Sequence, residues 1–527
     1  MSSEIVAFDV GTRPDDEDDR HEKHAGRANR GLVLPIIRIT GGSLPVTVDQ
    51  AEQFLIEYDA DVFQRGDFVV RPAPIMMPLA DQRQIFGLRL VPIRTQHLVE
   101  RLTRIVDFQR YDARSRSFKS IDCPSNVAAA YLQRTGQWQL RHLAGITNAP
   151  TLRPDGSILD QPGYDTATGI LYSPCDAAYA PVPQDPTRAE AECALADLKA
   201  LIREFQFVDE PSRSVALSGL LTAPIRRSLP TAPLHAYSAP VMGSGKSKLV
   251  DLASMVATGH EAPVIAQGKT EEEMEKRLGA ALIAGDTVVS FDNCEAPLGG
   301  ELLCQALTQA ALSIRILGRS VNVTVPNNAA FYATGNNLAV AGDMCRRAIV
   351  CSLDPKMERP ETREFEGEDP VETLRRRRPD YVRAVLVILR AFHIAGRPQQ
   401  ATPLGSFEGW SRWVRDGLIW LGEADPCVTM EQMRANDPRT RDLAAVLNQW
   451  SSAVGTGDVS VKRVIEYALD LPALREALLV VAGDHGAINS MKLGRWLSRS
   501  KGRVVDGLRV EQGPVVHGDQ RWRVVAI

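Results

Sequence analysis

The 527-residue sequence has no run that approaches the roughly 18 consecutive apolar residues of a membrane span. Its N-terminus also lacks the basic, apolar and small-residue pattern of a signal peptide. We therefore expect a soluble, cytoplasmic protein without a membrane partner. The net charge of −4 excludes a protein that coats nucleic acid through a generally basic surface, although a local basic channel or patch remains possible.

The sequence also lacks paired cysteines. Its eight cysteines are scattered and form no Cys-x-x-Cys pair, which argues against a zinc site and against a disulfide framework. Buried thiols in a reducing cytosol are the expectation. The region 32–173 contains neither an acidic triad nor a cysteine–histidine cluster of the kind a primase uses. Primer synthesis is thereby disfavoured.

A glycine-rich turn organises the middle of the chain. An apolar run from 234 leads into the turn, and a Lys-Ser pair follows it, from which a helical pattern runs over 246–258 and ends at Gly259. Such a turn offers backbone N–H groups to an anion at a helix N-terminus, so the pattern predicts a bound triphosphate. Lys246 would reach the β- and γ-phosphates, and the Ser247 hydroxyl would bind Mg²⁺. The residues expected to bind ATP are Met242, Gly243, Ser244, Gly245, Lys246, Ser247 and Lys248. Pro240 stands where the pattern usually begins with glycine, and the alternative is a surface Gly-Ser turn.

A second apolar run, 287–293, predicts a strand buried on both faces of a parallel sheet. Its final carboxylate, Asp292, would emerge beside the phosphates, where such sheets bind ligands. We expect Asp292 to hold Mg²⁺ together with Ser247. The alternative is a strand that simply ends in a solvated Asp-Asn turn.

Three further features follow along the chain. Strict alternation over 313–325 predicts a β-hairpin from which Arg315 and Arg319 project. Another buried strand, 329–334, leads to Asn336, which can orient a water toward the γ-phosphate. Arg346 and Arg347 come next, and an arginine beside a nucleotide supplies charge that a phosphoryl-transfer transition state requires.

In this order, the elements resemble the ATPase module of AAA+ and superfamily 3 proteins. Residues 239–247 resemble Walker A, 287–293 resemble Walker B, and 333–336 resemble sensor 1. The resemblance implies that Asn336 is the sensor, and that Arg346 or Arg347 is a finger contributed to a neighbouring subunit.

The resemblance leaves one catalytic role open. Asn293 stands where many AAA+ proteins place a glutamate, and Glu295 is a nearby carboxylate. Either residue could polarise the attacking water. The hairpin resembles the pre-sensor-1 hairpin of MCM and superfamily 3 helicases, which implies that Arg315 and Arg319 grip DNA in a central channel.

The region 233–398 is similar to the MCM-like, self-loading replicative helicases of bacterial mobile elements. The segment 152–165 is similar to the region before the ATPase in phage and island primase-helicases. Together these resemblances imply an ATP-dependent DNA helicase that acts on single-stranded or forked DNA. The helicase would form a ring, which we expect to be a hexamer. They also suggest replication proteins of the same element as partners.

The C-terminal third reads as helices followed by a hairpin. A helical lid is expected over 371–395, and its Arg375–Arg378 run is typical of a solvated helix face, with a nucleic-acid or subunit contact as the alternative. The final order of helices and strands predicts a winged helix. From Lys492 onward there are eight basic and three acidic residues, a net charge of +5. This excess suggests phosphate contacts by Lys492, Arg495 and Arg499, whereas a winged helix that binds protein or regulates the lid is the alternative.

The expected fold is therefore α/β, with an ATPase core of parallel strands and flanking helices between an N-terminal α+β domain and a C-terminal winged helix. The expected divisions are a disordered tail (1–30), the accessory domain (31–180), a helical linker (181–232), the core (233–370), a lid (371–455) and the winged helix (456–527). A non-unwinding AAA+ initiator or loader, or a defence or regulatory NTPase, is the alternative function. It would hydrolyse ATP without separating strands.

Overall fold

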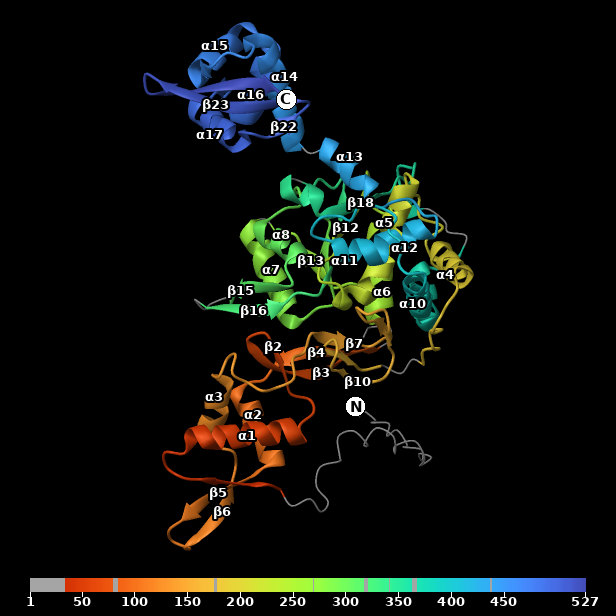
Figure 1. Cartoon of the computed structure of the whole chain (residues 1–527), viewed down its shortest axis with the longest axis vertical. Helices are drawn as coiled ribbons and strands as arrows, with labels where there is room; N and C mark the ends of the chain where they lie inside the picture. The colour runs from red at the N-terminus through yellow and green to blue at the C-terminus, as the bar shows by residue number, and fades with distance from the viewer. Residues whose placement is uncertain are drawn as a thin grey trace, which may run out of the picture. The chain divides into compact units, whose positions relative to one another are not determined.

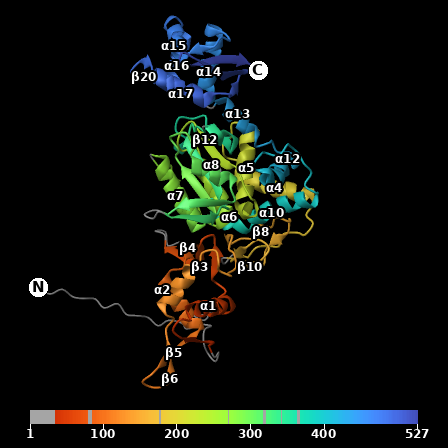
Figure 2. The same cartoon turned by 60° about the vertical axis from the view of Figure 1, so that its left-hand side comes forward.

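The computed structural model describes residues 34–78, 84–174, 178–268, 270–316, 321–340, 342–362, 367–436 and 438–527. The expected tail and the hairpin tip with Arg319 lie outside these residues. The chain forms two compact units (Figures 1 and 2). Unit 1 comprises residues up to Arg71 and Val91–Arg141, whereas unit 2 comprises Pro72–Leu90 and His142–Ile527. The range 31–180 is thus shared between the two units.

Unit 1 packs three helices against one face of a three-stranded sheet. The helices are α1 (Leu44–Tyr58), α2 (Thr95–Ile105) and α3 (Ser125–Leu132), and the strands β1 (Ile36–Ile39), β5 (Asp107–Asp112) and β6 (Ser117–Ile121) lie in the order β1-β5-β6. Ile37 and Phe108 are buried in the same core as Leu55, Leu98 and Leu102. Alternate residues along each strand face the other way, because successive side chains of a strand point to opposite faces.

A second three-stranded sheet has the order β2-β3-β4 and is formed by β2 (Phe63–Arg65), β3 (Phe68–Pro78) and β4 (Gln84–Pro92). Strands β3 and β4 each contribute residues to both units. The chain therefore enters and leaves unit 2 through this sheet before α2 begins.

The centre of unit 2 is a five-stranded parallel sheet of order β13-β14-β17-β12-β18. Its strands are β12 (Leu234–Ala239), β13 (Val264–Ala266), β14 (Val288–Asp292), β17 (Ala330–Asn336) and β18 (Ala348–Ser352). The first four residues of β14 and the first six of β17 are buried, as expected of apolar strands covered on both faces. The predicted α/β fold with a parallel sheet is confirmed.

The order of the strands creates a crevice for a ligand. From β12 the chain passes through α6 (Lys246–Thr258) to edge strand β13 and returns through β14 and β17, and β18 then pairs with the other side of β12. The strand order therefore reverses at β12. Parallel sheets bind ligands outside the carboxyl ends of their strands at such a reversal.

Helices and smaller pieces surround this sheet. Helix α6 agrees with its predicted bounds, and Thr270 caps α7 (Glu271–Ala284) by accepting from the N–H of Glu273. The other helices before the lid are α4 (Arg188–Leu201), α5 (Glu210–Ile225), α7 (Glu271–Ala284) and α8 (Glu301–Thr308), and the hairpin comprises β15 (Ala311–Arg315) and β16 (Asn322–Pro326).

The lid is two helices rather than the single helix expected over 371–395. Helix α9 (Pro370–Arg376) ends before α10 (Arg378–Ile394) begins. Pro379 lies at the start of α10, where its missing N–H and its ring prevent a continuous helix through Arg377.

The expectation of a solvated arginine face is wrong for Arg378, which is 8% exposed. Its Nε donates to the Met255 carbonyl at 2.8 Å, and its two terminal nitrogens donate to the Tyr179 hydroxyl and to Asn148 Oδ1, both at 2.8 Å. A guanidinium there satisfies carbonyls at the C-terminus of α6 and complements the helix dipole. The side chains of Arg375, Arg376 and Arg377 form ion pairs with acidic neighbours.

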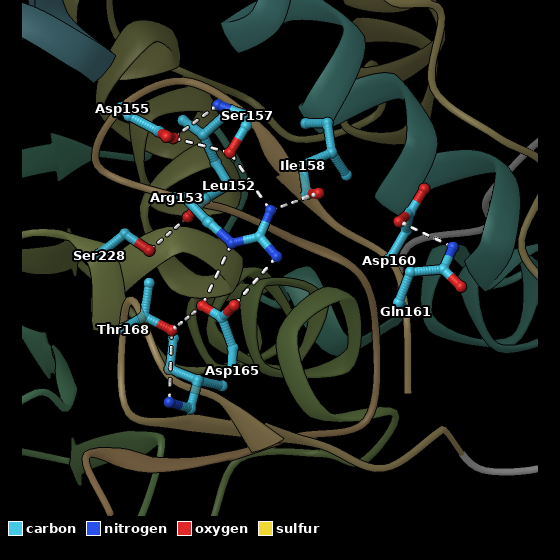
Figure 3. Close-up of polar contacts among 11 residues, drawn as sticks. Leu152, Arg153, Asp155, Ser157, Ile158, Asp160, Gln161, Asp165, Thr168 and Ser228 are labelled. Carbon is cyan, nitrogen blue, oxygen red and sulfur yellow. Dashed lines mark hydrogen bonds and ion pairs between the residues drawn. The ribbon is translucent and has the colours of Figure 1, made fainter. Parts of the chain in front are cut away.

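A small module of short strands precedes the sheet. It contains β7 (Gly145–Thr147), β8 (Thr151–Leu152), β9 (Ile158–Leu159), β10 (Gly163–Asp165) and β11 (Ile170–Tyr172). Arg153 binds Asp165 through two N–H···O bonds of 3.2 and 3.1 Å and also donates to the Ile158 carbonyl (Figure 3). Thr168 Oγ1 donates to Asp165 at 2.6 Å. The segment 152–165 thus forms a polar cross-link within the module.

This cross-link predicts a pH-dependent stability. The Arg153 guanidinium holds the pKa of Asp165 below its ordinary value, so its stabilisation is complete above the unfolded pKa of about 3.9 and is lost as pH falls through the lower folded pKa. We expect Asp165→Asn to reduce the free energy of unfolding by about 1–3 kcal/mol at pH 7. Denaturant unfolding of both proteins at pH 7 and near pH 3 measures this, and an undiminished difference at the lower pH would contradict it. Asp160→Asn, an exposed carboxylate in the same module, serves as the control.

The C-terminal region contains the predicted three helices followed by a hairpin. They are α15 (Val461–Asp470), α16 (Pro472–Ala482) and α17 (Ser490–Ser500), followed by β22 (Val504–Val505), β23 (Leu508–Val516) and β24 (Asp519–Ala526). Leu493 and Leu497 of α17 are buried with Trp522 of β24. The helix therefore turns its apolar stripe inward and leaves its basic residues outside.

The remaining elements connect the lid with this region. They are α11 (Glu408–Trp410), the π-helical turn Ser411–Arg415, α12 (Asp416–Trp420), α13 (Val428–Asn436), α14 (Pro438–Val454) and β19 (Val459–Ser460). A search of the described helices finds none with both the length and the apolar character needed to cross a bilayer.

Candidate nucleotide-binding site

The glycine turn joins β12 to α6 at the carboxyl edge of the parallel sheet. Gly243 and Gly245 have φ values of +73° and +87°, and Gly245 is the N-cap of α6. A Cβ on Gly245 would lie 2.8 Å from the Phe205 ring, and one on Gly243 would lie 2.9 Å from the backbone nitrogen of Glu361. Both the left-handed backbone and the close approach therefore require glycine here. The turn directs the N-terminus of a 13-residue helix at the crevice.

Lys246 lies inside this turn and is only 9% exposed. Its Nζ donates to the Val241 carbonyl and to Asn336 Oδ1, both at 2.9 Å. Burial lowers the pKa of Lys246, and the nearby charge of Asp292 opposes that shift. Among the residues that the structure describes, no carboxylate forms an ion pair with this ammonium. A largely desolvated cation with only neutral acceptors suits an incoming anion.

Asp292 lies at the end of β14 and meets two hydroxyls. Ser247 Oγ donates to its Oδ1 at 3.1 Å, and Thr334 Oγ1 of β17 donates to the same oxygen. The backbone N–H of Asn293 in turn donates to Thr334 Oγ1 at 3.1 Å. The sequence placed Ser247 and Asp292 together, and the structure brings them into direct contact. Thr334 was not singled out beforehand, although it lies within the 333–336 motif.

The fit of Mg²⁺ rests on this contact. A hydroxyl and a carboxylate at the mouth of a phosphate-binding turn are hard oxygen donors, and Mg²⁺ is commonly held by one or two such groups together with phosphate and water. In the described residues, no group of three or more His, Cys, Asp or Glu could hold a metal by itself. The residues present therefore fit a magnesium ion that arrives with a nucleotide.

The other candidate catalytic residues surround the same edge. Asn336, at the end of β17, is exposed and hydrogen-bonded to Lys246. Asn293 has a φ of +50° and follows Asp292, whereas Glu295 lies two residues further along, and both side chains are exposed. The contacts do not distinguish Asn293 from Glu295 as the group that polarises water.

The two arginines before β18 differ in their surroundings. The Arg347 side chain is 14% exposed and donates to the Cys304 carbonyl at 2.8 Å, to Thr308 Oγ1 at 2.7 Å and to Asp343. The Arg346 side chain is 58% exposed and pairs with Asp343. Arg347 is thus occupied in holding α8, while Arg346 faces solvent.

The remaining turn residues have individual roles. Met242 is 72% exposed, and Ser244 Oγ donates to the Val241 carbonyl at 2.6 Å. Lys248 pairs with Asp369, whose carboxylate also accepts from the N–H of Val371 at the start of α9. Lys248 therefore ties α6 to the lid.

A cavity of about 410 Å³ opens beside the glycine turn. Phe205, Pro355, Pro360 and Tyr381 supply apolar walls, and Glu361 lies at its rim against Gly243. Its size falls in the range of small-ligand pockets. Sequence reasoning missed these residues because they come from the end of α4, the loop after β18 and α10, and no local pattern marks them.

The residues predicted to bind DNA lie on two separate elements. Arg315 is exposed on β15, where Leu312 and Ile314 are buried on the opposite face. Lys492, Arg495 and Arg499 are all exposed on α17, and Lys492 pairs with Asp484 at 3.2 Å. Arg319 lies beyond the described part of the hairpin.

Comparisons with known proteins find similar solved structures but no similar sequences. No family model and no curated protein matches the sequence. Two apo A-form structures of the NrS-1 C-terminal region are similar at 13% identity. One, with a TM-score of 0.38, covers 90% of this chain and 99% of its own, and the other, at 0.36, covers 78% and 92%. A ligand-bound JCV helicase is similar at 14% identity and a TM-score of 0.20, covering 47% of this chain and 72% of its own.

Proposed function

We propose that the chain is an ATP-dependent DNA helicase of the AAA+ or superfamily 3 type, which works as a ring on DNA during replication of a mobile element. The contact of Ser247 with Asp292, beside Lys246 and Asn336, carries the ATPase part of the proposal. These side chains belong to one helix and two strands that are distant in sequence. Their meeting at a glycine turn is what a nucleotide triphosphate and its metal require.

The residues divide the work as follows. Gly243, Ser244 and Gly245 offer backbone N–H groups to the phosphates, and Lys246 exchanges its neutral partners for phosphate oxygens. Ser247 and Asp292 would hold Mg²⁺, which would neutralise charge on the phosphates when bound. Release of Lys246 frees the Asn336 amide to orient a water. Asn293 or Glu295 would then polarise that water by accepting a hydrogen bond from it.

The cavity beside the turn suits the nucleoside. Its apolar walls can take a planar base, since burial of apolar surface and ring contacts are favourable there. Tyr381 comes from α10, and Lys248 joins the turn to α9. Nucleotide binding would therefore be sensed directly by the lid helices.

The exposed Arg346 is the better of the two candidates for a finger. It can turn from Asp343 toward a phosphate held by an adjacent subunit, whereas withdrawal of Arg347 would break two contacts with α8. In phosphoryl-transfer enzymes, loss of such an arginine slows the reaction by several orders of magnitude. This assignment requires a ring, with ATP bound between subunits.

Two basic elements would hold the DNA. The β15–β16 hairpin would present Arg315 and Arg319 to a strand in the central channel, and the C-terminal region would act as a winged helix through Lys492, Arg495 and Arg499. Both contacts are electrostatic, so binding should weaken with salt.

Arg319→Ala tests whether the hairpin couples ATP hydrolysis to strand separation. We expect it to leave basal ATPase unchanged and to abolish unwinding of a forked duplex, because the hairpin grips DNA without touching nucleotide. Arg315→Ala should reduce unwinding in the same direction. Strand displacement, measured beside ATPase with and without single-stranded DNA, checks both.

Arg277→Ala is a suitable control, because this exposed arginine belongs to α7 and donates to the Ala266 carbonyl. Unwinding that survives Arg319→Ala would disprove the role of the hairpin. A ring that hydrolyses ATP but never separates strands, even in the unmodified protein, would instead favour a non-unwinding initiator, loader or regulatory NTPase.

A further inference from the structure

Within the described residues of unit 1, no helix covers one face of the β1-β5-β6 sheet. Figures 1 and 2 show α1, α2 and α3 gathered on one side of β5 and β6. Ile37 and Phe108 are buried on the helix-covered face, at 1% and 0% exposure. On the other face Ile36, Tyr111 and Phe118 are 49%, 53% and 40% exposed. This second face is called the open face below.

Two aromatic rings and an arginine form a cluster on the open face. Tyr111 and Phe118 are direct cross-strand partners, and their ring centroids lie 5.5 Å apart in an edge-on arrangement. Arg38 reaches across β5 from β1 and places its guanidinium carbon 4.4 Å from the centre of the Phe118 ring. The cluster spans three neighbouring strands, a width of about 10 Å.

The surroundings of the cluster are basic. Strands β1, β5 and β6 with the β5–β6 turn carry five basic and two acidic residues, although the whole chain has a net charge of −4. The basic residues are Arg38, Arg110, Arg114, Arg116 and Lys119, and all five are exposed. Arg38 lies on the open face, and Arg114 and Arg116 lie in the β5–β6 turn, whereas Arg110 and Lys119 alternate onto the face of Phe108. Of the acidic ones, Asp112 pairs with Lys119 at 2.5 Å, and Asp107 accepts from Gln109 Nε2 at 2.7 Å.

We propose that the open face, centred on Arg38, Tyr111 and Phe118, binds a single-stranded polynucleotide by stacking unpaired bases. Exposed rings on a sheet surface give bases a stacking partner, and a guanidinium plane can stack as well. Arg38 and the two arginines of the β5–β6 turn then follow the phosphates. A duplex hides the faces of its bases, and the centre of a protein interface is usually depleted of charge, so neither explains this combination as well.

This proposal is independent of the ATPase. Unit 1 contains none of the residues assigned to nucleotide binding, so stacking should occur without ATP. It places a contact for single strands outside the hairpin and the C-terminal region.

Photo-crosslinking of the full chain localises the contact. Oligo(dT) containing 5-iodouracil is irradiated with the protein in the absence of ATP, and crosslinked peptides are mapped by mass spectrometry. We expect crosslinks within 107–121, and we expect the double variant Tyr111→Ala/Phe118→Ala to lose them. Tyr111→Phe should retain them because it keeps the ring. No crosslink in this segment, or one that persists in the double variant, would overturn the proposal.

Fluorescence anisotropy gives the size of the effect. The double variant should bind oligo(dT) at least about five-fold more weakly, the lower end of what a stacking ring contributes. Arg38→Ala should reduce the slope of log affinity against log salt by about 0.7. Tyr58→Ala is the matched control, because Tyr58 is 48% exposed in the same unit but belongs to α1. All substituted residues are exposed, and circular dichroism verifies folding.

Separate arms distinguish the remaining outcomes. Oligo(U) in place of oligo(dT) shows whether RNA or DNA is preferred, and blunt duplex should bind without stacking crosslinks. Equal weakening by Tyr58→Ala, or loss of self-association with unchanged oligonucleotide binding, would contradict the proposal and identify a protein interface. If the protein forms these crosslinks but fails to hydrolyse ATP, the helicase proposal is refuted and the proposal for the open face still stands.

Discussion

Replacing Lys246 with alanine should reduce ATP hydrolysis by at least about 100-fold, the loss typical of removing one preorganised group that stabilises transition-state charge. Lys246 is nearly buried, and among described residues only the Val241 carbonyl and Asn336 Oδ1 accept its hydrogens. Alanine leaves no cation within the turn. Steady-state phosphate release, with and without single-stranded DNA, measures the effect.

Stability should change little in this variant. The exposed amide of Asn336 can hydrogen-bond with water when the ammonium is removed, so the cost is that of modest hydrogen bonds rather than a stranded charge. Lys276→Ala is the matched control, because its side chain lies on the surface of α7 in an i,i+4 pair with Glu272. ATPase that survives Lys246→Ala in a folded protein would contradict the proposed site.

Asp292→Asn should cause a loss of similar size through the metal. The amide retains an oxygen that can accept from Ser247 and Thr334, so the free energy of unfolding should change by only about 1 kcal/mol. The negative charge that attracts Mg²⁺ is lost, however. We expect hydrolysis to fall at least about 100-fold and to require much more Mg²⁺ for any residual rate.

A Mg²⁺ titration of hydrolysis, paired with binding of a fluorescent ATP analogue, separates the two effects. Nucleotide should still bind, because the turn and Lys246 remain. Asp160→Asn, an exposed carboxylate outside the sheet edge, controls for loss of charge alone. A variant with normal rate and normal Mg²⁺ dependence would show that Asp292 does not hold the metal.

Local sequence patterns predicted the strands and helices of the parallel-sheet region well. The segment 287–293 predicted a doubly buried strand, and β14 occupies Val288–Asp292. Helix α6 also has its predicted bounds, because glycine fixes both of its ends in the left-handed region. Such features depend on neighbours in sequence, so sequence reasoning finds them.

Long-range packing decided what the patterns could not. Arg378 turns inward because the carbonyls of α6 lie within its reach. The break of the expected lid helix, in contrast, has a local cause in Pro379. An arginine run has the same appearance in sequence whether it meets water or a helix end. Only the placement of α6 against α10 distinguishes the two.

The sequence by itself determined the alternation of strands and helices, the glycine turn and the identity of Lys246, Ser247 and Asp292, because backbone preferences and hydrophobic periodicity are local. The tertiary structure alone decided the strand order that brings Asp292 to Ser247, the walls of the adjoining cavity and the open face of unit 1. Each of these joins residues that are distant along the chain, and their meeting depends on how whole elements bury their apolar surfaces against one another.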